Sequence, residues 1–232
     1  MDTQVVILAG GLGTRLEGRT KNRPKSMVTV CDKPFLEYQL ELLKNGGINH
    51  VLLCIGYMGE QIAEHFGNGR KYGVNITYST EERPLGTAGA LKRAESFLKD
   101  TFFTMYGEAY LFLDFNEVMR YFRSHSKLAL MTVYKNYDLY DKSNTVVEGD
   151  LVKKYSKEER TKDTVYIDYG INIFNKEVLK MVPGNNFYSL EELFNDLIER
   201  EELLAFEVME RFYEIGSLSG LKDFEQYING VK

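Results

Sequence analysis

Apolar and polar residues alternate with two different periods in the first hundred positions of the chain. Short apolar runs predict buried strands at residues 4–8, 51–55, 74–78 and 102–106. Between them, leucines or small apolar residues at helical spacing predict helices at residues 36–44, 59–66 and 86–98. This alternation predicts right-handed crossovers, and therefore an α/β fold with a Rossmann-like, mostly parallel sheet flanked by helices.

The pattern changes in the second half of the chain. Two short alternating strands are joined there through Gly149-Asp150, a pair typical of hairpin turns, so we expect the sheet to be mixed. The other elements predicted in this half are strands at 128–133 and 165–174 and helices at 114–125, 190–200 and 221–228. No repeat or linker interrupts the pattern, which predicts a single domain over residues 1–232.

Composition excludes several classes of protein. Of the 232 residues, 44% are hydrophobic and 27% are charged, which is typical of a globular domain. The longest apolar runs have the length of strands and no basic-then-apolar leader precedes the first one, so we expect a cytoplasmic protein without a membrane partner. Cys31 and Cys54 form no CxxC pair and the three histidines are scattered, which argues against a zinc site.

Charge is distributed unevenly along the chain. The net charge of −5 argues against nucleic acid as a partner. A local cationic stretch nevertheless holds Arg15, Arg19, Lys21, Arg23 and Lys25, opposed only by Glu17. Such a stretch suits a small polyanion such as a triphosphate, although a solvated loop has the same composition.

A glycine loop, Gly10-Gly11-Leu12-Gly13, follows the first predicted strand. It lacks the Gly-Lys-Ser/Thr of a phosphate-binding P-loop, and Leu16 replaces the third glycine of the dinucleotide fingerprint, which argues against an NAD-binding oxidoreductase. Taken alone, the loop fits a phosphate contact or a tight turn equally well. Gly107-Glu108 also follows a strand, so we expect both segments at the same edge of the sheet.

Further motifs make the functional prediction specific. In order along the chain, these are the segments 10–16, 23–27, 33–38, 85–90, 106–108, 169–170 and 213–216. Together they resemble the sugar-1-phosphate nucleotidyltransferase family over nearly the whole chain. The branch that makes GDP-D-glycero-D-manno-heptose is most similar, from Pro34-Phe35-Leu36-Glu37-Tyr38, the segment 166–170 and the Tyr-Glu-Ile-Gly-Ser ending.

The resemblance implies an activity, a cofactor and partners. The enzyme would join an NTP to a sugar 1-phosphate, and the first choice of substrates is GTP and D-glycero-α-D-manno-heptose 1-phosphate. The product would serve capsule, S-layer or lipopolysaccharide precursor synthesis. It would use Mg²⁺ and release pyrophosphate. The sequence leaves open whether the protein forms a homo-oligomer. The nucleotidyltransferase fold would have a nucleotide-binding half at about 1–113, a sugar-phosphate-binding half at about 114–232 and no C-terminal β-helix.

Site roles follow from the same resemblance. Arg15 would stabilise the departing pyrophosphate, and Lys25 would neutralise charge near the α-phosphate. Lys157 would grip the sugar phosphate, with Lys154 as a competing candidate. The other implied nucleotide-binding residues are Leu8, Ala9, Gly10, Gly11, Gly13, Thr14, Gly86, Thr87, Ala88 and Gly107, and the other sugar-side residues are Asp168, Gly170, Asn172 and Glu191.

Two glutamates, Glu108 and Glu214, occupy the positions at which the wider family binds Mg²⁺ through aspartates. Glu214 also occurs in the heptose branch, whereas Glu108-Ala109 replaces the usual Asp-Ser. One extra methylene displaces a carboxylate by about 1 Å, and Mg²⁺ demands near-ideal geometry. A catalytically impaired, nucleotide-sensing relative is therefore one alternative, and a uridylyl-, cytidylyl- or thymidylyltransferase acting on another phosphorylated substrate is a second.

Overall fold

The computed structural model describes residues 3–11 and 22–230. The chain divides into two compact units that interleave along the sequence. The first, which we call the N-terminal unit, comprises the residues up to Pro84, Met105–Phe112 and the chain from Phe212 onward. The second, the central unit, comprises Leu85–Thr104 and Leu113–Arg211. Among the described residues, no helix is long and apolar enough to cross a membrane.

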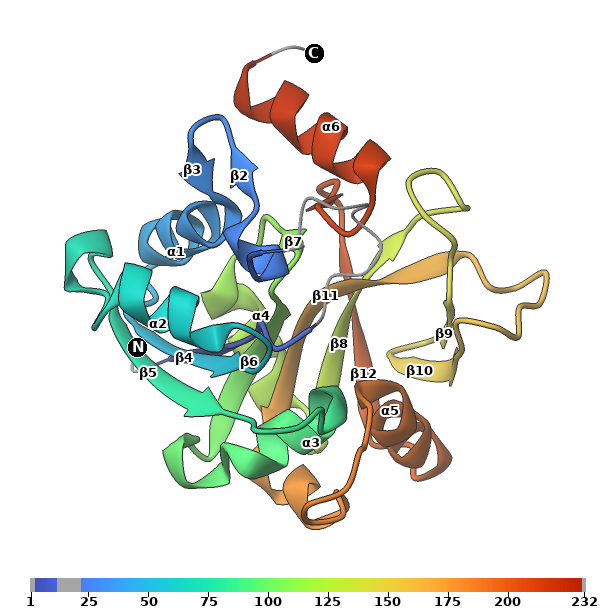
Figure 1. Cartoon of the computed structure of the whole chain (residues 1–232). Coiled ribbons are helices and arrows are strands. Elements are labelled where there is room, and N and C mark those ends of the chain that lie inside the picture. The colour runs from blue at the N-terminus through green and yellow to red at the C-terminus, as the bar shows by residue number, and fades with distance from the viewer. Residues whose placement is uncertain (1–2, 12–21, 231–232) are drawn as a thin grey trace. The chain divides into compact units, whose positions relative to one another are not determined.

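The N-terminal unit contains a parallel sheet. Its strands β1 (Gln4–Leu8), β4 (His50–Ile55) and β5 (Asn75–Thr80) lie in the order β5-β4-β1. Helix α1 (Phe35–Asn45) connects β1 to β4, and α2 (Gly59–Phe66) connects β4 to β5. Both connections step in the same direction, so right-handed crossovers place both helices on one face of the sheet (Figure 1). The strands and helices predicted for this segment are confirmed.

Short elements that the sequence pattern did not predict complete this unit. A 3₁₀ turn, η2 (Lys25–Met27), leads into a small hairpin of β2 (Thr29–Val30) and β3 (Lys33–Pro34). Another small ladder pairs β7 (Ala109–Tyr110) with β13 (Tyr213–Glu214). A further 3₁₀ turn, η3, spans Arg70–Tyr72. The ladder joins segments about a hundred residues apart in sequence and positions part of the candidate site.

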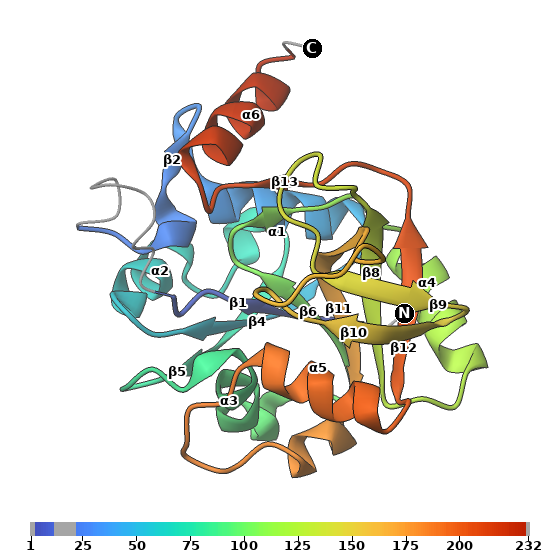
Figure 2. The same cartoon turned by 90° about the vertical axis from the view of Figure 1, so that its right-hand side faces the viewer.

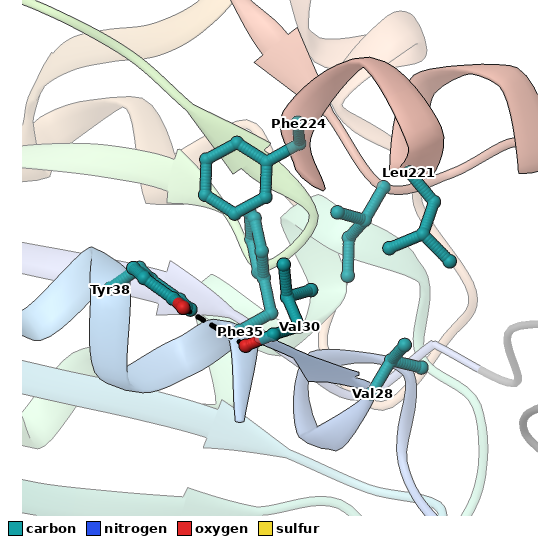
Figure 3. Close-up of a cluster of buried hydrophobic side chains, with 7 residues drawn as sticks. Val28, Val30, Phe35, Tyr38, Leu221 and Phe224 are labelled. Carbon is teal, nitrogen blue, oxygen red and sulfur yellow. Dashed lines mark hydrogen bonds between the residues drawn. The ribbon is translucent and has the colours of Figure 1, made fainter. Parts of the chain in front are cut away.

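The last helix, α6 (Leu218–Ile228), packs beside the β2–β3 hairpin through a buried aromatic cluster (Figure 3). Phe224 is fully buried, with ring centroids 5.1 Å from Phe35 and 5.4 Å from Tyr38. The Tyr38 hydroxyl donates to the Val30 carbonyl at 2.9 Å, so this buried polar group is satisfied. The cluster fixes α6 to this unit, and the described chain after β13 holds only this helix and no β-helix.

The central unit contains a mixed sheet with the strand order β11-β8-β12-β10-β9. β8 and β12 are parallel, whereas β8 and β11, and likewise β9 and β10, are antiparallel. The hairpin turn at Gly149-Asp150 is confirmed, and Gly149 has the positive φ, +58°, that such a turn requires. The strands are β8 (Ala129–Lys135), β9 (Thr145–Glu148), β10 (Leu151–Tyr155), β11 (Tyr166–Asn175) and β12 (Leu203–Val208).

Helices cover this sheet. α5 (Leu190–Glu199) packs on β10 and β12 and lies beside α3 (Gly86–Arg93) (Figure 2). α4 (Phe115–Ser124) packs through Phe115 on Phe103 of β6 (Thr101–Tyr106), a strand whose residues are divided between the two units. The helix predicted over residues 86–98 is interrupted: α3 ends at Arg93, and two 3₁₀ turns, η4 (Glu95–Phe97) and η5 (Lys176–Lys180), complete the unit. The predicted α/β class is confirmed.

Candidate active site

In the N-terminal unit, the carboxyl ends of β1, β4 and β5 bring together two glycines and a carboxylate. A Cβ at Gly10 would lie 2.8 Å from Glu81 Oε1, and a Cβ at Gly56 would lie 2.7 Å from the same atom. The Glu81 carboxylate therefore occupies the space above both glycines. Burial, and secondarily the charge of Glu81, raise the pKa of the Cys54 thiol to about 12, so this cysteine is an inert core residue.

The glycine loop and Gly107 lie at the same edge, as expected. The Gly107 amide donates to the Leu8 carbonyl at 3.0 Å. A Cβ at Gly107 would lie 2.8 Å from that carbonyl oxygen and 3.2 Å from Ala9 Cα, so a side chain there would separate the two segments. Glu108 is thereby fixed next to the start of the predicted nucleotide loop.

Lys25 and the two glutamates meet beside Gly216. The Lys25 side chain is 11% exposed, and its ammonium donates to Glu108 Oε2 in an ion pair. A Cβ at Gly216 would lie 2.6 Å from Glu214 Oε2, 3.1 Å from Lys25 Nζ and 3.4 Å from Glu108 Oε1. One cation and two carboxylates therefore surround a single point that only glycine leaves open.

Local structure explains how these side chains converge. Pro24 sets the entry to η2, where the Met27 amide donates to the Pro24 carbonyl at 2.9 Å, and this turn directs Lys25. Glu214 lies opposite Ala109 in the β7–β13 ladder, and the Ile215 amide donates to the Glu108 carbonyl at 2.9 Å. The backbone ladder, rather than the carboxylates themselves, therefore brings the two glutamates to one place.

The chemistry of this group suits a phosphate substrate with a hard cation. Two carboxylates supply the oxygen ligands that Mg²⁺ prefers, and Mg²⁺ at phosphate-transfer sites takes further ligands from phosphate and water. Over residues 3–11 and 22–230, no group of three or more His, Cys, Asp or Glu side chains is arranged to hold an ion. The Lys25 ammonium compensates the charge of Glu108, and an incoming phosphate would offer it a second anionic partner.

Three predicted nucleotide-loop residues, Gly13, Thr14 and Arg15, lie outside the described residues, so their roles remain predictions. Gly11 is exposed, and a Cβ there would meet nothing within 4 Å. The part of the predicted loop that the structure describes is thus open at Gly11 and closely packed at Gly10.

The α3 turn in the central unit is held by the backbone at Tyr188. The Ala88 and Gly89 amides both donate to the Tyr188 carbonyl, at 3.0 and 2.9 Å, and the Thr87 hydroxyl accepts from the Leu190 amide at 2.6 Å. Gly86 has φ +75°, and its Cβ would lie 2.6 Å from the Tyr188 oxygen. The Ala88 amide is thus engaged within the unit, so a base contact at this turn would use the amides of Gly86 or Thr87.

Two of the predicted sugar-side residues are neighbours. The Lys157 ammonium lies 4.0 Å from Glu191 Oε2, and the Lys157 amide donates to Glu191 Oε1 at 3.3 Å. The competing Lys154 pairs instead with Glu159 at 3.5 Å. Both lysines belong to exposed or half-exposed ion pairs, and Lys157 is the one adjacent to another predicted site residue.

The other predicted sugar-side residues lie at a bulge in β11. Asp168 opposes Val133 and Asn172 opposes Met131, so β11 carries extra residues between these pairs. Gly170 in the bulge has φ +98°, and its amide donates to Asp168 Oδ1 at 2.9 Å. Asn172 is 1% exposed, and neither atom of its side-chain amide has a hydrogen-bond partner among the residues that the structure describes, so this side chain is enclosed within the unit.

A polar network beside the bulge was not predicted from the sequence. Arg160 donates both to Asp138 Oδ1 and to Oδ2, and the Ser143 amide donates to Asp138 Oδ1 at 2.7 Å. The Arg160 contact and then the Ser143 amide lower the pKa of Asp138 to about 2. In the same loop, the Asn144 side chain accepts from the Asp168 amide at 2.9 Å. This Asp138–Arg160 pair therefore ties the loop before β9 to the segment after Lys157.

The chain is similar in sequence and in fold to known proteins. The profile of the nucleotidyl transferase family matches residues 4–229. A D-glycero-α-D-manno-heptose 1-phosphate guanylyltransferase of Campylobacter jejuni is 34% identical over 92% of this chain and 94% of its own. A UTP–glucose-1-phosphate uridylyltransferase of Synechocystis is 30% identical over 98% of this chain but only 63% of its own. The crystal structure of HddC from Yersinia pseudotuberculosis complexed with GMP-PN has a TM-score of 0.82 at 26% identity, covering 97% of this chain and 99% of that one.

The fold and the relatives define the class as that of sugar-1-phosphate nucleotidyltransferases. The chain belongs to the nucleotidyl transferase family. Sequence reasoning did not identify Gly56, Glu81 or Gly216 as candidate site residues. Gly56 and Glu81 follow predicted strands, so the rule that ligands bind at the carboxyl ends of parallel strands was the signal available for finding them.

Proposed function

We propose that this enzyme transfers the nucleoside monophosphate group of GTP to D-glycero-α-D-manno-heptose 1-phosphate, forming the GDP-sugar and pyrophosphate. The observation that carries the proposal is the convergence of Lys25, Glu108 and Glu214 beside Gly216. In a member of this family, that grouping fits a site for the reacting phosphates. The near-complete mutual coverage with the heptose enzyme of Campylobacter jejuni supports the choice of sugar.

The reaction needs little covalent help from the protein. An oxygen of the sugar phosphate attacks the α-phosphorus of the NTP, a new P–O bond forms, and the bond to the β-phosphate breaks as pyrophosphate leaves. Because the second pKa of such a phosphate monoester is about 6, the attacking oxygen is already anionic at neutral pH, and no general base is required. Catalysis then rests on positioning and on charge neutralisation.

The Lys25 ammonium has the role of neutralising charge at the α-phosphate in this proposal. Its side chain is largely shielded from water, where an ammonium interacts with phosphate more strongly than at an exposed site. Glu108 and Glu214 would hold Mg²⁺, which neutralises phosphate charge when bound. In the central unit, Lys157 would contact the sugar phosphate, and Glu191 would accept hydrogen bonds from sugar hydroxyls.

Glu81 supports guanine as the base. Its carboxylate covers Gly10 and Gly56 at the ends of the parallel strands, next to the predicted nucleotide loop. An ionised carboxylate only accepts hydrogen bonds, and guanine presents the N1–H and N2–H₂ donors side by side. Uracil and thymine present one N–H between two carbonyl oxygens, which a carboxylate would repel.

A substrate screen tests the proposal. Pyrophosphate release is measured for GTP, ATP, CTP and UTP, each with hexose and heptose 1-phosphates, at saturating Mg²⁺. We expect the highest kcat/KM for GTP with the heptose 1-phosphate. A preference for UTP or CTP would support the alternative uridylyl- or cytidylyltransferase, and dTTP in the same screen covers thymidylyl transfer. No release from the native chain, with release restored by Glu108→Asp, would support the nucleotide-sensing alternative.

The base assignment has a separate test. Glu81→Gln supplies an amide that both donates and accepts, so the preference for GTP over UTP should fall by on the order of 10- to 100-fold, the value of about 1–3 kcal/mol for a bidentate base contact. Glu82→Gln is the matched control, because Glu82 is an exposed neighbour of the same charge. An unchanged GTP/UTP ratio in Glu81→Gln would show that this carboxylate does not read the base.

A further inference from the structure

The Glu214 side chain is folded back against the start of α6. Its Oε2 accepts from the Gly216 amide and from the Ser217 amide, the latter at 3.1 Å, and its Oε1 accepts from the Ser217 hydroxyl at 2.5 Å. The carboxylate thus receives three donors from two successive residues. A glutamate has one more rotatable bond than an aspartate, and these contacts hold the longer side chain in one orientation.

Two glycines leave the space that the carboxylate fills. A Cβ at Gly220 would lie 1.8 Å from Glu214 Oε1, and one at Gly216 would lie 2.6 Å from Oε2. The Gly220 position is in the first turn of α6, where a glycine weakens the helix relative to an alanine. Its presence there is explained if the carboxylate needs that volume.

Ser217 connects the helix to the carboxylate. As the N-cap of α6, its hydroxyl oxygen accepts from the Gly220 amide at 2.9 Å, and its hydroxyl proton goes to Glu214 Oε1. One hydroxyl therefore satisfies a free amide of the helix and orients a charged side chain at the same time. An aspartate could perform only the first of these tasks.

We propose that Gly216, Ser217 and Gly220 form a cradle that positions the Glu214 carboxylate for Mg²⁺, with Ser217 as a positioning residue of the reaction. The inference rests on the proposed function of Glu214 as an ion ligand. Three donated hydrogen bonds leave part of the acceptor capacity of the carboxylate unused, because its two oxygens offer about four lone-pair positions. The unused capacity is what an ion would take, and the nearby Lys25 and Glu108 mark where phosphate charge would gather.

The test separates helix capping from orientation of the carboxylate. Ser217→Asp keeps a good N-cap but replaces the donor to Glu214 by a second negative acceptor, whereas Ser217→Thr keeps both functions. Ser219→Ala is the matched control, because the Ser219 hydroxyl lies 3.1 Å from the Ser217 hydroxyl, whereas the hydrogen bonds to the Glu214 carboxylate within the described part of the chain come from Gly216 and Ser217. Three quantities are measured: Mn²⁺ binding in the presence of a non-hydrolysable GTP analogue, the Mg²⁺ concentration that gives half-maximal turnover, and the thermal unfolding midpoint.

We expect Ser217→Asp to weaken Mn²⁺ binding and raise the half-saturating Mg²⁺ concentration by about 10- to 100-fold, the usual cost of losing a residue that orients a ligand. Its unfolding midpoint should stay within about 3 °C of the wild type, because the cap is retained. Ser217→Thr and Ser219→Ala should resemble the wild type in all three measurements. Gly220→Ala should weaken ion binding as Ser217→Asp does, since its methyl group displaces the carboxylate.

Two failures are distinguishable. Wild-type protein that releases no pyrophosphate with any NTP contradicts the proposed function, whereas the Mn²⁺ titration still tests the cradle. Wild-type protein that binds Mn²⁺, with Ser217→Asp and Gly220→Ala binding it equally well, overturns the cradle and leaves the proposed function standing.

Discussion

Truncation of Phe224 tests whether the aromatic cluster holds α6 in place. The ring is fully buried, and the three nearest ring centroids are those of Tyr110 at 4.9 Å, Phe35 at 5.1 Å and Tyr38 at 5.4 Å. Phe35 and Tyr38 meet it edge-on, an arrangement that adds to the energy of simple burial. Phe224→Ala removes all of these contacts without removing a polar group or a charge.

The expected loss in free energy of unfolding depends on how far the surrounding side chains can close the cavity that Phe224→Ala leaves. Truncation of a buried phenylalanine to alanine costs about 3–5 kcal/mol, and the larger values belong to rigid surroundings that cannot close the cavity. Here Tyr110, Tyr213 and Ile228 are only partly buried and can move toward the gap. We therefore expect Phe224→Ala to lower the free energy of unfolding by an amount near the lower limit, about 3 kcal/mol. For a chain of this length, that corresponds to a fall in the unfolding midpoint of about 6–12 °C.

Calorimetric unfolding and hydrogen exchange measure the two consequences of Phe224→Ala. We expect the lower midpoint together with faster exchange of the α6 amides, because the helix loses its main buried anchor. Lys222→Ala on the same helix is the control: Lys222 is exposed, so its truncation should lower the free energy of unfolding by less than about 1 kcal/mol. A midpoint lowered by less than about 2 °C with unchanged exchange in α6 would refute the anchoring role.

Three further predictions concern charge and backbone geometry. Lys25→Ala should lower kcat by about 100- to 1,000-fold, as expected for loss of one group that stabilises transition-state charge, and near-wild-type turnover would contradict its phosphate role. Arg160→Ala should raise KM for the sugar phosphate more than KM for the NTP. Because Arg160 holds the pKa of Asp138 at about 2, below its ordinary 3.8, the stability that this pair adds is present above pH 3.8 and lost as pH falls toward 2. The difference in free energy of unfolding between wild type and Arg160→Ala, measured in urea, should therefore shrink below pH 3.8. A difference that grows there would contradict this role of the ion pair. Gly86→Ala should destabilise the protein, because its φ is +75° and its Cβ would lie 2.6 Å from a carbonyl oxygen, whereas Gly184→Ala meets nothing within 4 Å and serves as the control in thermal unfolding.

Sequence periodicity predicted the elements whose side chains face a core with a regular period. β1 and α2 have the predicted bounds, because their buried positions follow the strand and helix periods without interruption. The strand β12 was missed: its apolar residues begin directly after the turn that ends α5, where Glu201 has φ +55°. Two-residue strands such as β2 and β7 have no period to detect, and long-range pairing alone defines them.

Sequence periodicity could not predict how the residues of the candidate active site come together either. Lys25, Glu108 and Glu214 are separated by 83 residues or more in sequence, and no local pattern relates them. The resemblance to a known family suggested their roles, and the β7–β13 ladder is the physical reason that the two glutamates are close. The Asp138–Arg160 pair had no such help: each residue reads as an ordinary surface charge, and the left-handed backbone at Asp138, φ +61°, gives no reliable signal in sequence.

At each of the two predicted ion-binding positions, where the resemblance leads us to expect aspartate, the structure accommodates the longer glutamate. At Glu214 the extra methylene is taken up by folding the side chain against α6, in space that Gly216 and Gly220 leave free. At Glu108 the carboxylate is held by the Lys25 ammonium, which the η2 turn directs. The loss of geometric precision expected from a longer side chain applies to one that rotates freely, and neither of these does. A restrained Glu108 therefore loses less geometric precision than the length of its side chain suggests.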